Sequence, residues 1–306
     1  MTDAGSFSRD PLTRLTLVGT ESDEAVQAAD AAAFAAGVTV REATALTELE
    51  DVVQLFARIW GRDTNPPVTV ELLRAFSKAG NYVGAAFEGG RLVGACVGFF
   101  HAPGDDALHS HIAGVERGLD GRHVGFALKL HQRSWALRHG VSEIAWTFDP
   151  LVSRNAYFNL VKLGARPVEY LPNFYGGLRD GINGEDDTDR LLLRWNLVAP
   201  NVSAACLGQR ETALVAAETE RGAVVALDAS DAGTPVVGRL DAALSLVAAP
   251  RDIEALRIRD PDKTKQWRVA MRTVLGGLMA AGGRVTGFDR DGWYVVCRDD
   301  EKGSSA

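Results

Sequence analysis

The chain has 306 residues, of which 46% are hydrophobic and 24% are charged, as is typical of a globular protein with a sizeable core. At about 100–200 residues per domain, this length favours two domains over one. The net charge of −7 argues against general attraction to nucleic acid or to an anionic membrane, although backbone amides could still bind an anionic cofactor.

The three cysteines, Cys96, Cys206 and Cys297, are far apart and lack Cys-x-x-Cys spacing, so the sequence predicts neither a disulfide framework nor a zinc site. The first residues have neither the basic start nor the apolar core of a signal peptide. No run approaches the roughly 18 apolar residues of a membrane-spanning helix. We therefore expect a cytoplasmic protein with reduced thiols and no bound metal.

Hydrophobic periodicity, together with Gly and Pro as breakers, predicts the element order β-α-α-β-β-β-α-β-α-β-β between residues 37 and 199. The strands are expected at residues 38–42, 82–87, 92–100, 108–115, 144–148, 167–170 and 191–195. Four helices are expected in this region. The first begins at about residue 47, the second covers residues 70–78, the third follows the loop at 118–125 and ends at Gly140, and the fourth covers residues 155–163. This order predicts an α/β fold with helices on a mixed sheet, preceded by an extension over residues 1–36.

The character of the sequence changes after residue 198. Short strands are expected at residues 223–227 and 244–247, a helix at 262–281, and a hairpin at 284–288 and 293–297. Residues 200–306 are therefore predicted to form a second, smaller α/β unit.

A glycine-containing loop, residues 118–125, joins the strand that ends at Val115 to the following helix. The element order and this junction resemble the GNAT superfamily of N-acetyltransferases over about 160 residues. In that family the strand is followed by Arg-x-x-Gly-x-Gly/Ala, and the amides of this turn face the pyrophosphate of coenzyme A. The resemblance implies a mixed central sheet with a splayed cleft, acyl-coenzyme A as co-substrate, and no metal.

The sequence fits this motif in two registers. Residues 122–127 satisfy Arg-x-x-Gly-x-Ala literally, whereas counting from the strand end places residues 120–125 on the motif and starts the helix at Ala127-Leu128. We prefer the second register, in which Asp120 stands where arginine is usual and His123 where the first glycine is usual. The residues that the resemblance assigns to the cofactor are Val115, Gly121, Arg122, His123, Val124, Gly125, Phe126, Ala127 and Asn155.

The helix at 155–163 also resembles its counterpart in the family, whose first asparagine often reaches the cofactor. Many members place a tyrosine four residues before the glycine that ends this helix, as general acid. That position is Leu160 here, so Tyr175 is a candidate replacement, or else a packed aromatic. Local strings such as residues 109–111, 146–150 and 173–176 resemble a bacterial branch with a C-terminal extension. That branch implies amino-acid-like amines and acyl groups that can be larger than acetyl.

Acyl transfer from a thioester requires a neutral amine, a partner for the carbonyl oxygen and a proton for the leaving thiolate. Strand alternation places His109 and His111 on one face, with Ala113 and Val115 beside them. An imidazole with an ordinary pKa near 6.5 could take the ammonium proton, or either histidine could be structural. His111 is the better candidate base because it lies deeper in the strand.

Asp149 follows an apolar strand and either orients an amine or caps the turn before Pro150. Arg190 could bind a substrate carboxylate, with Asp180 and Asn183 in the same loop, or pair internally with an aspartate. Arg268 and Arg272 share a helix face, either as an exposed stripe or as partners of the cofactor phosphates.

These residues predict an acyl-coenzyme A-dependent N-acyltransferase that acts on a small amine by direct attack on the thioester. The partner is expected to be this small molecule, not nucleic acid or membrane, and a homodimer is left open. The alternative is a GNAT-like binding or regulatory protein without turnover, which the departures at Asp120, His123 and Leu160 favour.

Overall fold

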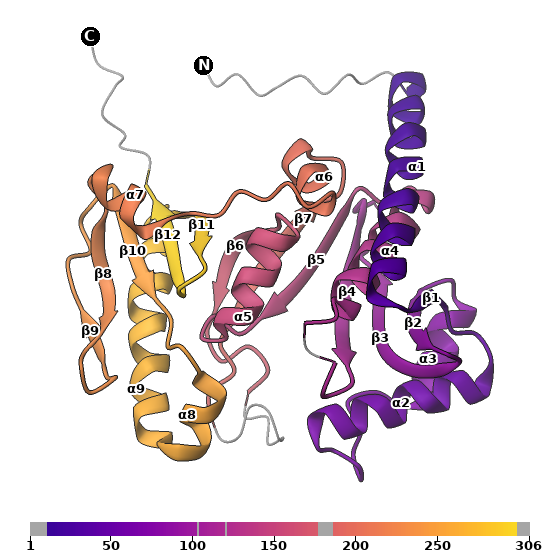
Figure 1. Cartoon of the computed structure of the whole chain (residues 1–306), viewed down its shortest axis with the longest axis horizontal. Helices are drawn as coiled ribbons and strands as arrows, with labels where there is room; N and C mark the ends of the chain where they lie inside the picture. Colours follow the sequence, from indigo (N-terminus) through magenta and orange to yellow (C-terminus); the bar gives the residue numbers. More distant parts are fainter. Residues whose placement is uncertain (1–10, 103, 120, 177–185, 299–306) are drawn as a thin grey trace. The chain divides into compact units, whose positions relative to one another are not determined.

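The computed structural model describes residues 11–102, 104–119, 121–176 and 186–298 (Figure 1). The chain divides into two compact units. The first unit comprises Met1–Ile59, Asp63–Ile144 and Asn196–Ser203, and the second comprises Trp60–Arg62, Ala145–Trp195 and Ala204–Ala306. The domain boundaries expected at residues 36 and 199 stay predictions.

The first unit is built on four antiparallel strands that pair in chain order. Its elements are α1 (Pro11–Ala36), β1 (Thr39–Glu42), α2 (Leu46–Trp60), α3 (Val70–Lys78), β2 (Tyr82–Glu88), β3 (Arg91–Phe100), β4 (Ala107–Val115) and α4 (Val124–Arg138). The start of α3 is capped by Thr69, whose hydroxyl accepts a hydrogen bond from the Leu72 amide at 3.3 Å.

Helix α4 packs closely on β3 because two glycines of that strand face it. A Cβ added at Gly94 would lie 3.0 Å from a methyl of Leu128, and one at Gly98 would lie 3.0 Å from Nε2 of Gln132. Helix α1 packs along α4 (Figure 1). Its buried alanines are Ala25, Ala28, Ala29 and Ala36, so the Ala-rich acidic run near the N-terminus is a helix that buries some of its alanines.

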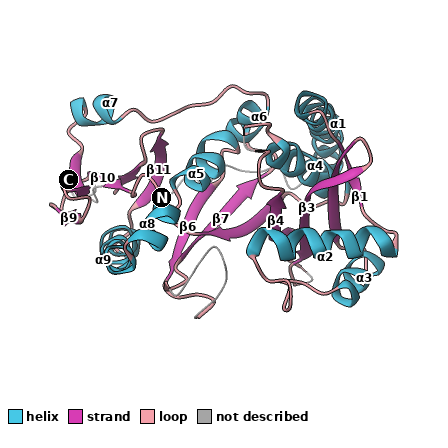
Figure 2. Ribbon diagram, turned by 60° about the horizontal axis from the view of Figure 1, so that its bottom comes forward, coloured by secondary structure: helices cyan, strands magenta, loops and turns pink. Residues whose placement is uncertain are grey.

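The second unit carries a further sheet and most of the short helices (Figure 2). Its elements include α5 (Ser153–Ala156), a π-helical continuation η1 (Tyr157–Lys162), β6 (Arg166–Leu171), β7 (Arg190–Asn196), α7 (Val215–Glu220), β8 (Val224–Ala229), β9 (Pro235–Val237), β10 (Leu244–Ala248), α8 (Ile253–Arg259), α9 (Pro261–Met271), η2 (Arg272–Gly276), α10 (Gly277–Ala280), β11 (Arg284–Asp289) and β12 (Trp293–Cys297). Helix α6 (Pro200–Cys206) lies where the chain passes from the first unit to the second.

Two sheets organise these strands. The seven-stranded sheet has the order β1-β2-β3-β4-β5-β7-β6, in which β5 (Glu143–Phe148) begins in the first unit and continues in the second. The five-stranded sheet has the order β11-β12-β10-β8-β9, with β8 and β10 parallel and the other pairs antiparallel. The predicted α/β class and the smaller C-terminal sheet are confirmed.

Each strand and helix expected between residues 37 and 199 is present, with bounds within two residues of those predicted. The helix expected at 262–281 is continuous but contains the π-helical turn η2. The sequence did not predict α6, α7, α8 or β9. Each has at most seven residues, so its hydrophobic pattern is too short to show a period.

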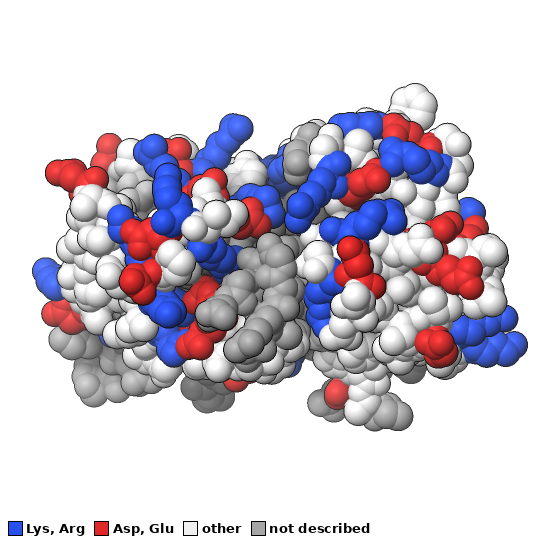
Figure 3. Space-filling view, turned by 90° about the horizontal axis from the view of Figure 1, so that it is seen from below, with Lys and Arg blue, Asp and Glu red and all other residues white. Residues whose placement is uncertain are grey.

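The described surface gives no sign of a large single-charge patch on the face drawn in Figure 3, where basic and acidic side chains are interspersed. Of the helices that the structure describes, none has the length and apolar character needed to cross a membrane.

Candidate active site

Strand β4 contains a β-bulge at His111. Ile112 pairs with Val97 of β3, and the next pair joins Ser110 to Gly98. The two pairs are consecutive on β3, but on β4 they are separated by one extra residue, His111. Ser110 then faces α4, as Gly98 does, while His109 lies opposite Phe99 on the other face.

The bulge changes which side chains share a face with the histidines. Val115 is paired with Gly94, which faces α4, and a Cβ at Gly125 of α4 would lie 3.7 Å from a methyl of Val115. Ala113 is on the same face by alternation. The expectation that Ala113 and Val115 lie beside the two histidines is therefore wrong, because the extra residue reverses the alternation after His111.

The two imidazoles do lie together, as predicted. Their ring centroids are 6.2 Å apart, and the Phe99 ring is 5.1 Å from His109 and 5.8 Å from His111. Burial, with smaller contributions from His111, His101 and Lys129, lowers the pKa of His109 to about 4. Burial also lowers the pKa of His111. Both rings are thus neutral near pH 7, the form in which an imidazole can accept a proton.

The turn before α4 contains a non-glycine residue with a positive φ. His123, the N-cap residue, has φ +63° and ψ +16°, in the left-handed region that favours glycine. This is the position at which the family motif usually has its first glycine, so here a histidine adopts a glycine-like conformation. Gly121, two residues earlier, also has a positive φ of +80°.

The N-terminus of α4 offers backbone donors to an anion. The side chain of the N-cap residue His123 makes no capping hydrogen bond, and the first turn of the helix contains no acidic residue. Within the part of the chain that the structure describes, the N–H groups of Val124 and Gly125 donate no hydrogen bond, whereas those of Phe126 and Ala127 donate to the carbonyl of His123. Such an end combines free donors with the positive end of the helix dipole.

Arg122, which the resemblance assigns to the cofactor, is bonded to protein groups in this structure. Its guanidinium donates to the carboxylate of Glu88 at 2.6 Å and to the Ala36 carbonyl at 3.4 Å. This pairing ties the loop to the end of β2.

Replacing His123 with glycine is expected to stabilise the protein, because a non-glycine residue costs about 1–2 kcal/mol in this conformation. Part of the gain is offset by the greater freedom of glycine in the unfolded chain. We expect the free energy of unfolding of His123→Gly to exceed that of His123→Ala by about 1 kcal/mol in urea denaturation. The alanine variant is the matched control, since it removes the imidazole but keeps the Cβ. Equal stabilities would show that the turn carries no such cost.

Asp149, in the second unit, is 7% exposed and hydrogen-bonded on both oxygens. It accepts two bonds of 2.8 Å from Arg268 and one of 2.5 Å from Arg257. Its Oδ1 also accepts from the Leu151 amide at 2.9 Å, so the turn-capping alternative is confirmed. Burial alone would raise the pKa of Asp149, but Arg268, Arg257 and Arg190 outweigh it and hold the pKa well below its usual range. A role in orienting an amine stays a prediction.

Asp149 belongs to a larger set of paired charges, which we call the Asp–Arg cluster. Its members are Asp149, Asp186, Asp187, Asp189, Arg190, Arg257, Arg268 and Arg272.

Arg268, 1% exposed, bonds Asp186 as well as Asp149, and Arg272 donates to Asp189 at 2.6 Å and to Asp187 at 2.7 Å. The expectation of an exposed stripe is wrong for Arg268, because its guanidinium is buried and bonded to the carboxylates of Asp149 and Asp186. The acidic run at 186–189 is the signal that could have indicated this pairing.

Arg190 and Tyr175 lie next to this cluster. Arg190 donates to the Asp189 carbonyl at 3.0 Å, and its Nη1 is 3.8 Å from an Asp149 oxygen, so the internal Asp–Arg pairing is present. Its guanidinium carbon is 5.5 Å from the centre of the Tyr175 ring, whose hydroxyl is 3.1 Å from Oγ1 of Thr147. Asp180 and Asn183 lie outside the described residues.

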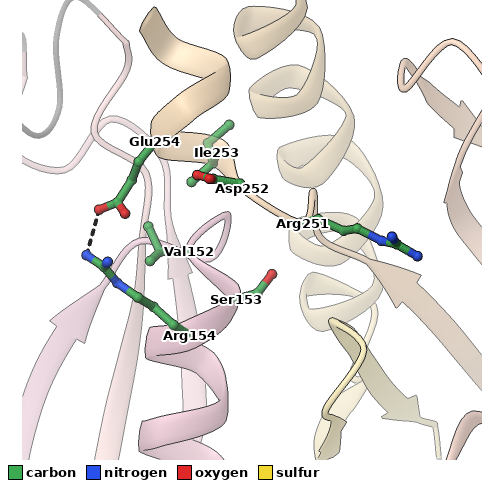
Figure 4. Close-up of a pocket in the computed structure, with 7 residues that line it drawn as sticks. All are labelled: Val152, Ser153, Arg154, Arg251, Asp252, Ile253 and Glu254. Atoms are coloured by element: carbon green, nitrogen blue, oxygen red, sulfur yellow. Dashed lines mark hydrogen bonds and ion pairs between the residues drawn. The ribbon is translucent and has the colours of Figure 1, made fainter. Parts of the chain in front are cut away.

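Asn155 is exposed on α5, and its neighbours Ser153 and Arg154 line a pocket of about 240 Å³ (Figure 4). Arg154 donates a 2.7 Å hydrogen bond to Glu254, which also lines the pocket. No residue that the sequence predicted for the site lines it, so the pocket supports none of those assignments. Among the described residues, no group of three or more His, Cys, Asp or Glu is arranged to hold a metal ion.

A comparison with models of known protein families finds no match to the chain, and a comparison with curated proteins finds none either. Solved structures do match. An acetyltransferase of the GNAT family from Streptococcus pneumoniae has 14% sequence identity and a TM-score of 0.43, covering 51% of this chain and 97% of that chain.

The ribosomal-protein-S18-alanine N-acetyltransferase from Escherichia coli has 13% identity and a TM-score of 0.42, covering 52% of this chain and 94% of that one. The Salmonella typhimurium protein yncA, solved with its cofactor acetyl-CoA, has 17% identity and a TM-score of 0.43, with coverage of 52% and 94%. Identities this low say nothing of catalysis or substrate in this chain. Over about half its length, the chain is similar to these acetyltransferases.

Proposed function

We propose that the protein is an acyl-coenzyme A-dependent N-acyltransferase. The observation that carries the proposal is the junction of β4 and α4. There, an uncapped helix N-terminus with a glycine-like turn follows a strand that presents two neutral imidazoles on one face. An anion site and a proton acceptor on consecutive elements are what transfer from a pyrophosphate-bearing thioester to an amine requires.

In this proposal the amides of Val124 and Gly125 hold the pyrophosphate, and coenzyme A supplies the activated acyl group as a thioester. The amine nitrogen bonds to the acyl carbon and the carbon–sulfur bond breaks. His111 accepts the proton that the amine loses. The departing thiolate takes up a proton from solvent, so the products are an amide and a thiol.

The acceptor is proposed to be a small amine of the amino-acid type, which carries a carboxylate beside the amine, and Arg190 is the proposed partner of that carboxylate. Its pairing with the Asp189 carbonyl and Asp149 leaves this assignment dependent on a rearrangement of those bonds. Replacing Arg190 with lysine, which should raise the KM of a carboxylate-bearing amine about tenfold, tests it. An unchanged KM removes Arg190 from the substrate site.

Gly125→Pro tests the pyrophosphate site directly. Proline is tolerated in the first turn of a helix but has no N–H, so the variant removes one donor while retaining the helix. We expect coenzyme A to bind about 10–100-fold more weakly in calorimetric titration, the loss of one hydrogen bond to a charged group.

Gly125→Ala is the matched control, because it keeps the N–H and its Cβ would make only an ordinary 3.7 Å contact with Val115. Equal affinities for the two variants would remove this amide from the site. If the wild-type protein binds neither coenzyme A nor acetyl-coenzyme A up to millimolar concentrations, the proposed activity is wrong. Binding without turnover of any amine would instead support the alternative of a binding or regulatory protein.

A further inference from the structure

Lys129 is a buried lysine under the strand that carries the two histidines. Its side chain projects from α4, and the residue is only 5% exposed. Its Nζ donates to Oγ of Ser110 at 3.1 Å and to Oε1 of Gln132 at 2.8 Å. The Sγ of Cys96 is 3.6 Å from the same Ser110 hydroxyl. These four side chains form a polar group on the face of β4 opposite the imidazoles.

Burying an ammonium group normally costs free energy, so the buried position of Lys129 suggests a role that offsets this cost. Burial lowers the pKa of Lys129 to about 8, an effect that Cys96 partly opposes. The groups that face it are Cys96 on β3, Ser110 on β4 and Gln132 on α4, and its charge also disfavours protonation of His109.

On the face towards α4, few other side chains define the register of β3 on β4 near the bulge, whereas Val97, Phe99 and Ile112 lie on the other face. Gly94 and Gly98 of β3 have no side chain to distinguish one register from the next, and neither does Gly114 of β4. A shift of one residue in a strand moves every following side chain to the opposite face. Ser110 is the last residue before the bulge, and its hydroxyl is held on the α4 face.

We propose that Lys129 is a positioning residue: by bonding Ser110, it fixes the β4 bulge at His111 and so holds both imidazoles on the face away from α4. The link to acyl transfer rests on the proposed function, but the positioning itself does not. With Ser110 anchored, the extra residue must be His111, because the pairing of Ile112 with Val97 resumes immediately afterwards.

Two substitutions of Ser110 isolate the hydroxyl. Ser110→Thr and Ser110→Val have the same shape, so the cost of the added bulk is shared and only the hydroxyl differs, with its bond to Lys129 and its contact with Cys96. Lys129→Met removes the donor from the other side.

The first measurement is NMR of the ligand-free protein, using ring-to-ring contacts between Phe99 and both histidines and the pH titration of each imidazole. We expect Lys129→Met and Ser110→Val to lose the contacts between His111 and Phe99 and to shift the His109 titration upward, while Ser110→Thr retains the wild-type pattern. If Lys129→Met and Ser110→Val both keep wild-type ring contacts and titrations, the proposal is overturned. Should Lys129→Met fail to fold, the threonine–valine pair decides the question.

Turnover of acetyl-coenzyme A is the second measurement. We expect kcat to fall about 10–100-fold in Lys129→Met and Ser110→Val, since a misplaced base loses effective molarity, with the KM for acetyl-coenzyme A unchanged. Ser110→Thr is expected to rescue kcat. If the wild-type protein shows no turnover, the proposed function is overturned but the positioning role of Lys129 is not, because NMR tests that role without turnover.

Discussion

Arg268→Met is expected to lower the free energy of unfolding by about 3–5 kcal/mol, the usual cost of removing one partner from a buried ion pair. Arg268 donates to both Asp149 and Asp186, and all three side chains are buried. Methionine fills a similar volume but offers no donor, so two carboxylates lose their principal cation. Urea denaturation at pH 7 measures the loss.

The pH dependence of that loss identifies its cause. The pKa of Asp149 is lower in the folded protein than its unfolded value near 3.9. Its ion pairs therefore stabilise the protein fully above about pH 3.9, and this stabilisation is lost as the pH falls through the folded-state pKa. In Arg268→Met the carboxylate lacks this support, so burial favours its protonation. The difference in stability between wild type and variant should therefore shrink as the pH is lowered below about 4.

Val269→Ala, at the neighbouring and 59% exposed position, is the control and should change stability by less than about 0.5 kcal/mol. A gap between Arg268→Met and wild type that is independent of pH would mean that lost packing, not charge, explains the effect.

His111→Gln is expected to lower kcat for amine acylation by about 10²–10⁴-fold, the usual contribution of a general base. Glutamine keeps a polar side chain but cannot take the proton of the amine at neutral pH. The KM for acetyl-coenzyme A should not change, because the α4 N-terminus is intact. Steady-state kinetics from pH 6 to 9 provide the measurement.

Since burial lowers the pKa of His111, the acid limb of the wild-type profile should lie below the ordinary histidine value near 6.5. His139→Gln is the matched control, because His139 lies at the end of α4 and is not part of the proposed site. Its ring stacks on that of Trp135, with the ring centroids 3.9 Å apart. Wild-type turnover by His111→Gln throughout this pH range would rule out His111 as the base, and the same measurement on His109→Gln would then test its neighbour.

The sequence predicted the elements of the fold well because each long strand or helix carries its own hydrophobic period. It also brought His109 and His111 together correctly, since alternation holds over two residues. It could not predict the bulge at His111, because one extra residue has no periodic signature and depends on pairing with β3.

Long-range pairing was the other source of error. Arg268 reads as an ordinary polar residue of a helix, and its partner Asp149 lies 119 positions away. The sequence analysis did not single out Lys129, because only the packing of α4 on β4 reveals its contact with Ser110. In both cases the sequence shows the charge but not the environment that determines its role.

The Asp–Arg cluster also sets an order for folding during synthesis. Asp149 and Asp186 leave the ribosome before any of the three C-terminal arginines, and Asp186 precedes the first of these, Arg257, by 71 residues. At about 5–20 residues per second, this interval lasts on the order of 4–14 seconds. During that time these carboxylates stay hydrated, because burying them unpaired would cost several kcal/mol. The nascent second unit therefore completes its interior only when α9 has been translated.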